Sequence, residues 1–163
     1  MDVERAARRR PCFAGLDRHA PGRNFASGGR LLKKALANVR RSTILVVDDE
    51  TEFCRLLERS LGRTKWRVLS ATDGRGALKM LKDGRIDLVI LDIRLPDMDG
   101  IEILRRIRGE RPNVPVLMLT AHGAMDTARR TMELGAYDYL TKPFDLPTLE
   151  KVIEEALRDI RCR

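Results

Sequence analysis

The chain has few cysteine and histidine residues, and none of them form a recognisable pair. Cys12, Cys54 and Cys162 lie far apart, and the two histidines, His19 and His122, share no motif. Zinc sites in proteins draw their ligands from short, regular spacings, and disulfide-stapled domains need an even and denser set of cysteines. The sequence therefore predicts neither a zinc site nor a thiol-redox site.

The chain also lacks a long hydrophobic run. No stretch approaches the roughly 18 consecutive apolar residues of a membrane-spanning helix. No apolar segment follows the arginines near the amino terminus, which argues against a secretory signal. We therefore expect a cytoplasmic protein.

Positive charge is in excess in only one part of the chain. The formal net charge is +8, and residues 1–41 hold 11 Lys and Arg against 3 acidic residues, whereas residues 42–163 hold 21 of each sign. Residues 1–41 are rich in turn-forming residues and poor in large apolar ones, which predicts a disordered basic extension. The length of 163 residues predicts one domain besides this extension. Because the remainder is neutral, it gives no electrostatic support for direct DNA binding.

Two alternatives remain open for the basic extension. Leu31, Leu32, Ala35, Leu36 and Val39 fall at helical spacing among basic residues, so a short amphipathic helix could bind nucleic acid or an anionic membrane. The other alternative is an overlong gene model, with the true start close to Val39.

Four short runs of branched aliphatic residues each end in polar residues. They lie at residues 44–49, 88–92, 116–121 and 137–143. Each run is too short for a helix, and its composition is typical of a strand buried on both faces of a parallel sheet. Alternating residues predict a further strand at 66–71.

Segments of helical length separate these strands. The first begins at Asp49 and carries Phe53, Leu56, Leu57 and Leu61 on one face. Four further helices are predicted at residues 73–81, 100–107, 125–134 and 145–160. Alternating strands and helices indicate a doubly wound α/β fold, with a five-stranded parallel sheet and five helices.

Polar residues follow the predicted strands at the edge where open α/β sheets bind ligands. Asp48, Asp49, Asp92, Thr120 and Lys142 should converge there, because the carboxyl ends of parallel strands share one edge. Carboxylates suit Mg2+, the lysine supplies an opposite charge, and the threonine can donate to a new anion. This set of groups predicts phosphoryl transfer onto an aspartate.

Four strings match, in order and spacing, the receiver domains of two-component response regulators. They are Val-Val-Asp-Asp-Glu at 46–50, Leu-Asp-Ile-Arg-Leu-Pro-Asp-Met-Asp-Gly at 91–100, Thr-Ala at 120–121 and Tyr-Leu-Thr-Lys-Pro-Phe at 139–144. The wording is closest to receivers of the nitrogen-regulatory class. The resemblance implies a flavodoxin-like fold with strand order 2-1-3-4-5, formed by a receiver domain at 42–163.

The resemblance implies roles for the acidic residues and the lysine. Asp92 is similar to the family's phosphoacceptor. Asp49, Asp92 and the backbone carbonyl of Arg94 resemble its direct Mg2+ ligands, and Asp48 resembles the residue that supports the ion. Lys142 is similar to the lysine that pairs with these carboxylates and with the phosphoryl group.

Further positions resemble the family's switch and rim residues. Thr120 is similar to a residue of the family's catalytic site, together with Asp92 and Lys142. Thr120 and Tyr139 also resemble the family's pair of switch residues. Arg94 and His122 occupy rim positions that vary in the family and tune the lifetime of the phosphoryl group. The Lys142-Pro143 bond matches a peptide bond that is cis in the family, and a cis X-Pro bond costs only about 0.5–1 kcal/mol.

The function implied by the resemblance is a phosphorylation-dependent signalling switch. The donor would be the phosphohistidine of a sensor histidine kinase or of a histidine phosphotransfer protein, and catalysis would be limited to self-phosphorylation and slow dephosphorylation. The changed surface would be the fourth helix, fifth strand and fifth helix, where a downstream protein or a second copy docks. Receivers of this class normally precede an ATPase module and a DNA-binding module, and nothing follows Arg163. We therefore expect a stand-alone receiver or a receiver fragment.

Two other functions are weighed against this switch. One is a metal-dependent phosphatase with an aspartyl nucleophile, but such enzymes commonly place a second Asp two residues after the nucleophile, where this chain has Arg94. The other makes the basic extension at 1–41 the output, binding nucleic acid or membrane under the control of the receiver.

Overall fold

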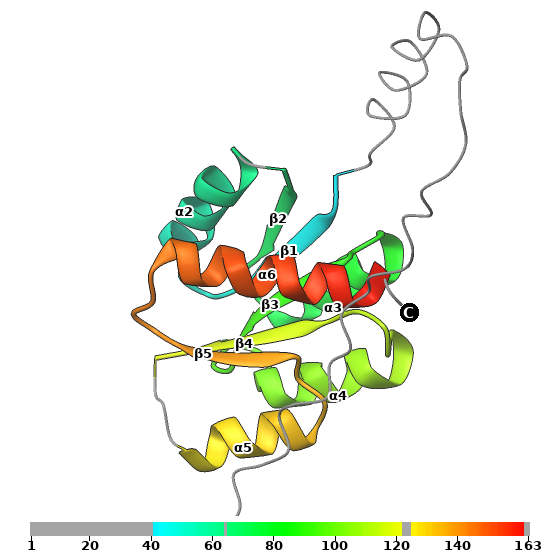
Figure 1. Cartoon of the computed structure of the whole chain (residues 1–163). Helices are drawn as coiled ribbons and strands as arrows, with labels where there is room; N and C mark the ends of the chain where they lie inside the picture. Colours follow the sequence, from blue (N-terminus) through cyan, green and yellow to red (C-terminus); the bar gives the residue numbers. More distant parts are fainter. Residues whose placement is uncertain (1–40, 64, 122–124, 162–163) are drawn as a thin grey trace, which may run out of the picture. The chain divides into compact units, whose positions relative to one another are not determined.

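The computed structural model describes residues 41–63, 65–121 and 125–161 (Figure 1). In these residues five strands alternate with five helices. The strands are β1 (Thr43–Val47), β2 (Arg67–Ala71), β3 (Leu88–Asp92), β4 (Val116–Thr120) and β5 (Asp138–Thr141). The helices are α2 (Thr51–Gly62), α3 (Gly74–Asp83), α4 (Gly100–Glu110), α5 (Met125–Glu133) and α6 (Leu146–Arg161).

The strands form one parallel sheet in the order β2-β1-β3-β4-β5. This confirms the predicted doubly wound fold and its strand order. Every residue of β1, β3 and β4 is buried, whereas the edge strands β2 and β5 are partly exposed. Branched aliphatic side chains fill the three inner strands because helices cover both of their faces.

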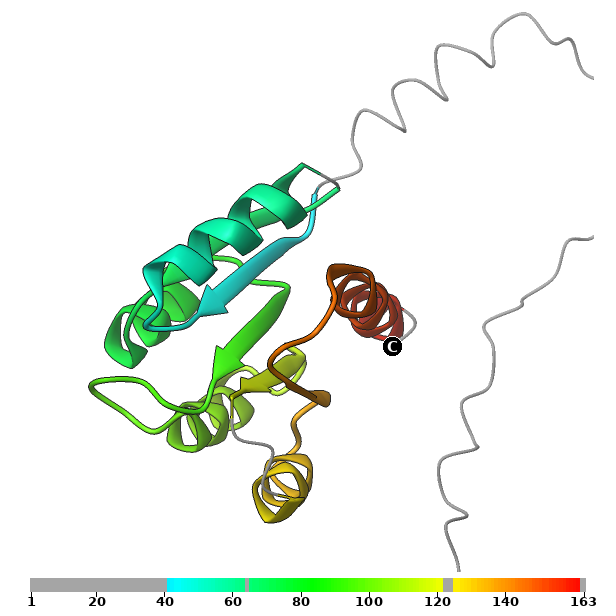
Figure 2. The same cartoon turned by 90° about the vertical axis from the view of Figure 1, so that its left-hand side faces the viewer.

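Helices on the two faces of the sheet create two hydrophobic cores. Ile44 and Val46 point into a core that they share with α2 and α6, and Leu45 and Val47 point into a core shared with α3 and α4. This division follows from the period of two along a strand. Helices α5 and α6, yellow and red, are seen nearly end-on in Figure 2 and run in roughly the same direction.

The predicted helix boundaries are largely observed. The side chain of Asp73 accepts a hydrogen bond from Gly76 N (2.7 Å) at the start of α3, and Asp145 does the same for Thr148 N (2.8 Å) at the start of α6. Gly135, which follows α5, has a φ of 90°, a conformation that favours glycine.

Two expectations for the first described helix are wrong. Helix α2 begins at Thr51 and not at Asp49, because the Asp48 carboxylate accepts a hydrogen bond from Glu50 N (3.0 Å) and holds this segment outside the helix. Leu56 was expected on the buried face but is 53% exposed. The buried stripe runs through Cys54, Leu57 and Leu61, and Leu56 falls to one side of it. No helix in the described part of the chain is long and apolar enough to cross a membrane.

Candidate functional site

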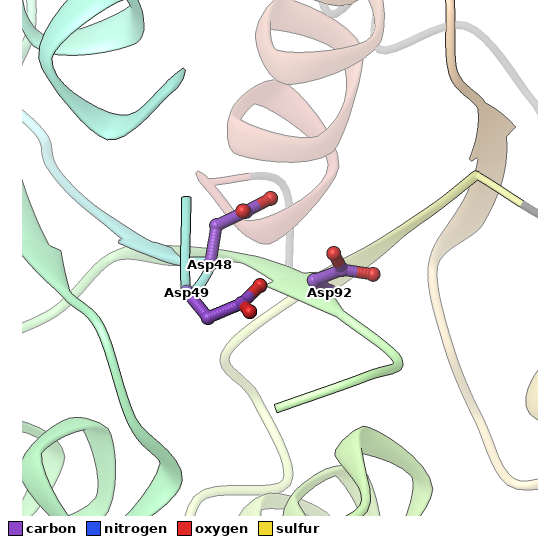
Figure 3. A group of neighbouring side chains, drawn as sticks. All are labelled: Asp48, Asp49 and Asp92. Carbon is purple, nitrogen blue, oxygen red and sulfur yellow. The ribbon is translucent and has the colours of Figure 1, made fainter. Parts of the chain in front are cut away.

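Three carboxylates meet at the carboxyl-terminal edge of the sheet. Asp48 and Asp49 follow β1, and Asp92 is the last residue of β3, so their side chains lie next to one another (Figure 3). One oxygen from each lies within 4.8 Å of the others. Asp48 is 1% exposed and Asp92 9% exposed, whereas Asp49 faces solvent. We call this set the carboxylate cluster; its oxygens could hold one divalent ion.

Lys142 provides the positive charge at the cluster. Its ammonium donates a hydrogen bond to Asp48 Oδ2 and another, of 3.2 Å, to Asp92 Oδ2. Burial lowers the pKa of Lys142, but the attraction of Asp48 and Asp92 outweighs burial and leaves the pKa above its ordinary value. The lysine is therefore charged at neutral pH, as an electrostatic partner of an anion must be.

Burial disfavours the charged form of Asp48, the carboxylate that Lys142 contacts. Removal from water raises the pKa of Asp48, and the hydrogen bonds from Lys142 and from Glu50 N only partly offset this effect. Crowded carboxylates disfavour their own ionisation unless cations join them. The cluster is thus an environment that favours the addition of a cation.

Backbone groups orient the Asp92 side chain. Asp92 Oδ1 accepts hydrogen bonds from Ile93 N (2.6 Å) and Arg94 N (3.5 Å), so Oδ2 is the oxygen that faces Lys142. Gly100 N donates to Ile93 O (2.7 Å) and closes the loop that follows β3. A side chain at Gly100 would collide with the backbone oxygen of Asp92 and would approach Ile93 Cα to 2.8 Å.

The same loop is attached to the neighbouring helix. Asp97 accepts hydrogen bonds from Gly74 N (2.7 Å) and Arg75 N (3.0 Å) at the start of α3. These bonds lower the pKa of Asp97 below its ordinary value. Asp97 therefore holds the loop that follows Asp92 against α3, and the Arg94–Asp99 bridge joins the two ends of that loop.

Thr120 and Tyr139 lie on the same face of the sheet. Thr120, 4% exposed, pairs with Thr141 in the register of β4 and β5, and Tyr139 precedes Thr141 by two residues. Because side chains two residues apart point to the same side, both residues face the core shared with α3 and α4. Tyr139 packs against that core and is partly buried.

Phe53 is a contact that sequence reasoning did not assign to the site. Its ring, on α2, lies with its centroid 4.2 Å from Lys142 Nζ, and it meets the Phe144 ring edge-on at a centroid distance of 6.0 Å. In the sequence, the signal for Phe53 is that it follows Asp49 by four residues on a segment predicted to be helical. That signal is weak because the position reads equally well as part of the buried helix face.

The remaining residues that the sequence singled out are the rim residues, the basic extension, Cys54 and the Lys142–Pro143 bond. Arg94 is exposed on the loop after β3, and His122 lies outside the described residues, as do residues 1–40 of the basic extension predicted at 1–41. Cys54 on α2 is 2% exposed, and its thiol donates a hydrogen bond to Asp48 O (3.3 Å). Burial raises the pKa of this thiol to about 11. The Lys142–Pro143 bond is cis, as the resemblance implied.

Comparisons with known proteins identify the family of this chain. The response regulator receiver domain family matches residues 44–154. The transcriptional regulatory protein ZraR of Klebsiella oxytoca is 42% identical over 118 residues, which are 72% of this chain and 27% of that protein. The response regulator protein PilR of Pseudomonas aeruginosa is also 42% identical over 118 residues, 72% of this chain and 26% of that protein.

A solved structure shows the same fold. The receiver domain of a CheY-like response regulator from Methanospirillum hungatei JF-1 has a TM-score of 0.73 at 27% identity, over 75% of this chain and 98% of that one. The chain spans about a quarter of the length of the two curated relatives above. Those relatives are of the nitrogen-regulatory class, as the wording of the motifs predicted. With its motifs, strand order and carboxylate edge in agreement, the chain belongs to the response regulator receiver domain family of two-component systems.

Proposed function

We propose that this receiver is a phosphorylation-dependent switch in which Asp92 accepts a phosphoryl group from phosphohistidine. The donor is a sensor histidine kinase or a histidine phosphotransfer protein. The observation that carries the proposal is the position of the Lys142 ammonium, which bonds to both Asp48 and Asp92 beside a third carboxylate, Asp49. A nucleophilic carboxylate with a charged ammonium at its oxygen suits the capture of a phosphoryl group.

The transfer exchanges one bond to phosphorus for another. A carboxylate oxygen of Asp92 bonds to phosphorus, the phosphorus–nitrogen bond of the donor breaks, and its electron pair stays on the imidazole. Lys142 neutralises charge on the phosphoryl oxygens, and the Thr120 hydroxyl donates a hydrogen bond to one of them. Both groups stand at strand ends held by the sheet, so little reorganisation is needed when charge develops.

The residues present fit a magnesium ion. Three carboxylates within reach of one another form a hard oxygen donor set, which Mg2+ prefers. Asp49, Asp92 and the backbone carbonyl of Arg94 would hold the ion, and Asp48 would support it. When bound, Mg2+ neutralises charge on the carboxylates and phosphoryl oxygens, which would otherwise repel each other.

A specific residue disfavours the phosphatase alternative. Arg94, two residues after Asp92, carries an exposed basic side chain where such phosphatases place an acidic one. A guanidinium cannot protonate a leaving group, because it keeps its proton at any working pH. Catalysis by this chain is therefore limited to its own phosphorylation and slow dephosphorylation.

The proposed output is a change of the surface formed by α5, β5 and α6, where a downstream protein or a second copy would dock. Tyr139 on β5 supports this assignment, since it is only partly buried and therefore belongs both to the core and to this surface. Direct DNA binding by the receiver is not part of the proposal. Three further points stay predictions from the sequence. They are a cytoplasmic location, a domain boundary near residue 42 and an output through the basic extension.

Labelling with radioactive acetyl phosphate in Mg2+ tests the proposal. The wild-type chain should take up acid-stable, base-labile label, Asp92→Asn should take up none, and Asp49→Asn should need more Mg2+. Asp87→Asn is the matched control: Asp87 precedes β3 at the opposite edge of the sheet, where its carboxylate accepts a hydrogen bond from Thr43 N (2.8 Å). Equal labelling of Asp92→Asn and wild type, with both folded by circular dichroism, would contradict the site.

A further inference from the structure

Phe53 connects two parts of the site that are distant in the sequence. It is the third residue of α2, and its ring packs partly buried against the core shared with α6. Its centroid lies 4.2 Å from Lys142 Nζ, and its plane meets that of Phe144 at 81°. Phe53 thus contacts both Lys142 and the residue two positions after it.

The contact with Lys142 matters because a lysine side chain has many rotamers. Fixing four rotatable bonds costs conformational entropy, so an ammonium at the rim of a site tends to spend part of its time in water. Asp48 and Asp92 attract it, and the electron-rich ring face attracts it too, at a distance well inside the roughly 6 Å limit for cation–π interactions. The Phe53 ring therefore adds a third attraction for the ammonium. The ring carries no net charge, so it does not repel the oxygens of a phosphoryl group.

We propose that Phe53 is a positioning residue for phosphoryl transfer, whose ring face holds the Lys142 ammonium at the carboxylate cluster. The inference rests on the proposed function, in which Lys142 meets the phosphoryl group on Asp92. A carboxylate partner can be lost to the incoming cation, because Asp48 and Asp92 both belong to the proposed metal site. The Phe53 ring does not bind that cation, so it keeps the ammonium in place through the reaction.

Phe144 strengthens this reading of Phe53. Its ring meets Phe53 edge-on, an arrangement that favours one orientation of the pair. Phe144 is partly buried and packs against the same core. The Phe53 ring is thus held by a contact with Phe144 in addition to its contact with Lys142.

Stepwise fluorination of the Phe53 ring separates this role from packing. Mono-, di- and trifluorophenylalanine, introduced at position 53 alone, keep the shape of the ring but withdraw electrons from its face. The rate constant for phosphorylation by acetyl phosphate at saturating Mg2+ should fall at each step, reaching roughly fivefold with three fluorines. Phe53→Leu should lose about as much, and Phe53→Tyr should retain nearly the wild-type rate. Fluorinated tryptophan at Trp66, whose ring lies 5.6 Å from Lys65 Nζ next to the start of β2, is the matched control and should change the rate less than about twofold.

The outcomes distinguish this inference from the function on which it rests. If the wild-type chain takes up no label, the proposed function fails. If the wild type is labelled and the rate is the same for every fluorinated ring at position 53, the positioning role is overturned. The role is also overturned if Phe53→Leu is phosphorylated slowly while the fluorinated rings all give the wild-type rate, because the effect of Phe53→Leu would then come from packing alone. Thermal unfolding of each fluorinated protein shows that the fold is intact.

Discussion

The backbone nitrogen of Lys142 donates a hydrogen bond of 2.8 Å to the backbone oxygen of Thr120. The two residues end neighbouring strands, and their side chains are proposed to meet the same phosphoryl group. We therefore expect a shift of the segment after β4 to reach the segment after β5 through this backbone bond. Tyr139, on β5 and on the same face as Thr120, lies within the strand that would receive this shift.

Thr120→Ala should leave Asp92 phosphorylatable but should uncouple the response of Tyr139. The substitution removes the hydroxyl and retains the backbone bond to Lys142. A hydrogen bond to the charged phosphoryl group contributes about 1.5–3 kcal/mol, enough to bias a two-state element. The chain has two tyrosines, so 3-fluorotyrosine labelling gives one fluorine signal each for Tyr137 and Tyr139. Phosphorylation should shift the Tyr139 signal in the wild type and not in Thr120→Ala.

Internal controls accompany this experiment. The Tyr137 hydroxyl donates to Asp159 Oδ2 (2.9 Å) and should keep its signal in both states. Thr141→Ala, at the exposed register partner of Thr120, should respond like wild type. In a double-mutant cycle on phosphorylation-dependent dimerisation or partner binding, the losses from Thr120→Ala and Tyr139→Ala should be strongly non-additive. Additive losses would mean that the signal leaves Asp92 by another route.

Gly100→Ala should destabilise the chain and slow its phosphorylation. The new methyl group would collide with the backbone of Asp92 and Ile93, so the loop that orients the Asp92 carboxylate must move. We expect a loss of about 1–3 kcal/mol in the free energy of unfolding, measured by urea denaturation. Gly109→Ala is the control in the same helix, where the structure has open space. It should stabilise the chain by about 0.5–1 kcal/mol and leave labelling unchanged.

Asp97 should contribute stability that depends on pH. Its pKa in the folded chain is lowered below 3.8 by the backbone hydrogen bonds from Gly74 and Arg75. The contribution is therefore present above pH 3.8 and is lost as the pH falls through the folded-state pKa. Asp97→Ala should unfold at lower urea than wild type at pH 7, and the two curves should converge in acid. Asp97→Asn, which keeps one acceptor oxygen, should lie between them at pH 7. A constant gap at all pH values would contradict the ionic origin of this stability.

Arg94 and His122 should set the lifetime of the phosphoryl group. The exposed Arg94 side chain follows Asp92 by two residues, at the rim where an attacking water approaches. His122 follows Thr120 by two residues in the sequence and lies outside the described part. Replacing both with Ala should change the dephosphorylation rate several-fold while changing Mg2+ affinity little, measured by loss of label and by metal titration. Arg106→Ala, which removes an exposed ion pair with Glu102 on α4, should leave the half-life unaltered.

Much of the fold could be predicted because it depends on patterns of neighbouring residues. Runs such as residues 88–92 read as buried strands, since their branched side chains suit no exposed element. Parallel strands joined by helices bring their carboxyl ends to one edge, so Asp48, Asp92 and Lys142 could be grouped before any distance was known. The cap at Asp145 and the turn at Gly135 likewise follow from local backbone chemistry.

Contacts between side chains on different elements were decided only by the tertiary structure. Leu56 is one of the apolar residues of α2, but the buried side of that helix runs through Cys54, Leu57 and Leu61 and leaves Leu56 exposed. Asp97 accepts a hydrogen bond at the start of α3, from a residue 23 positions away in the sequence. The Phe53 ring lies over Lys142 because α2 and the segment after β5 pack on the same hydrophobic core. Local sequence patterns record which side of a helix is apolar, and they carry no information on which distant residue that side meets.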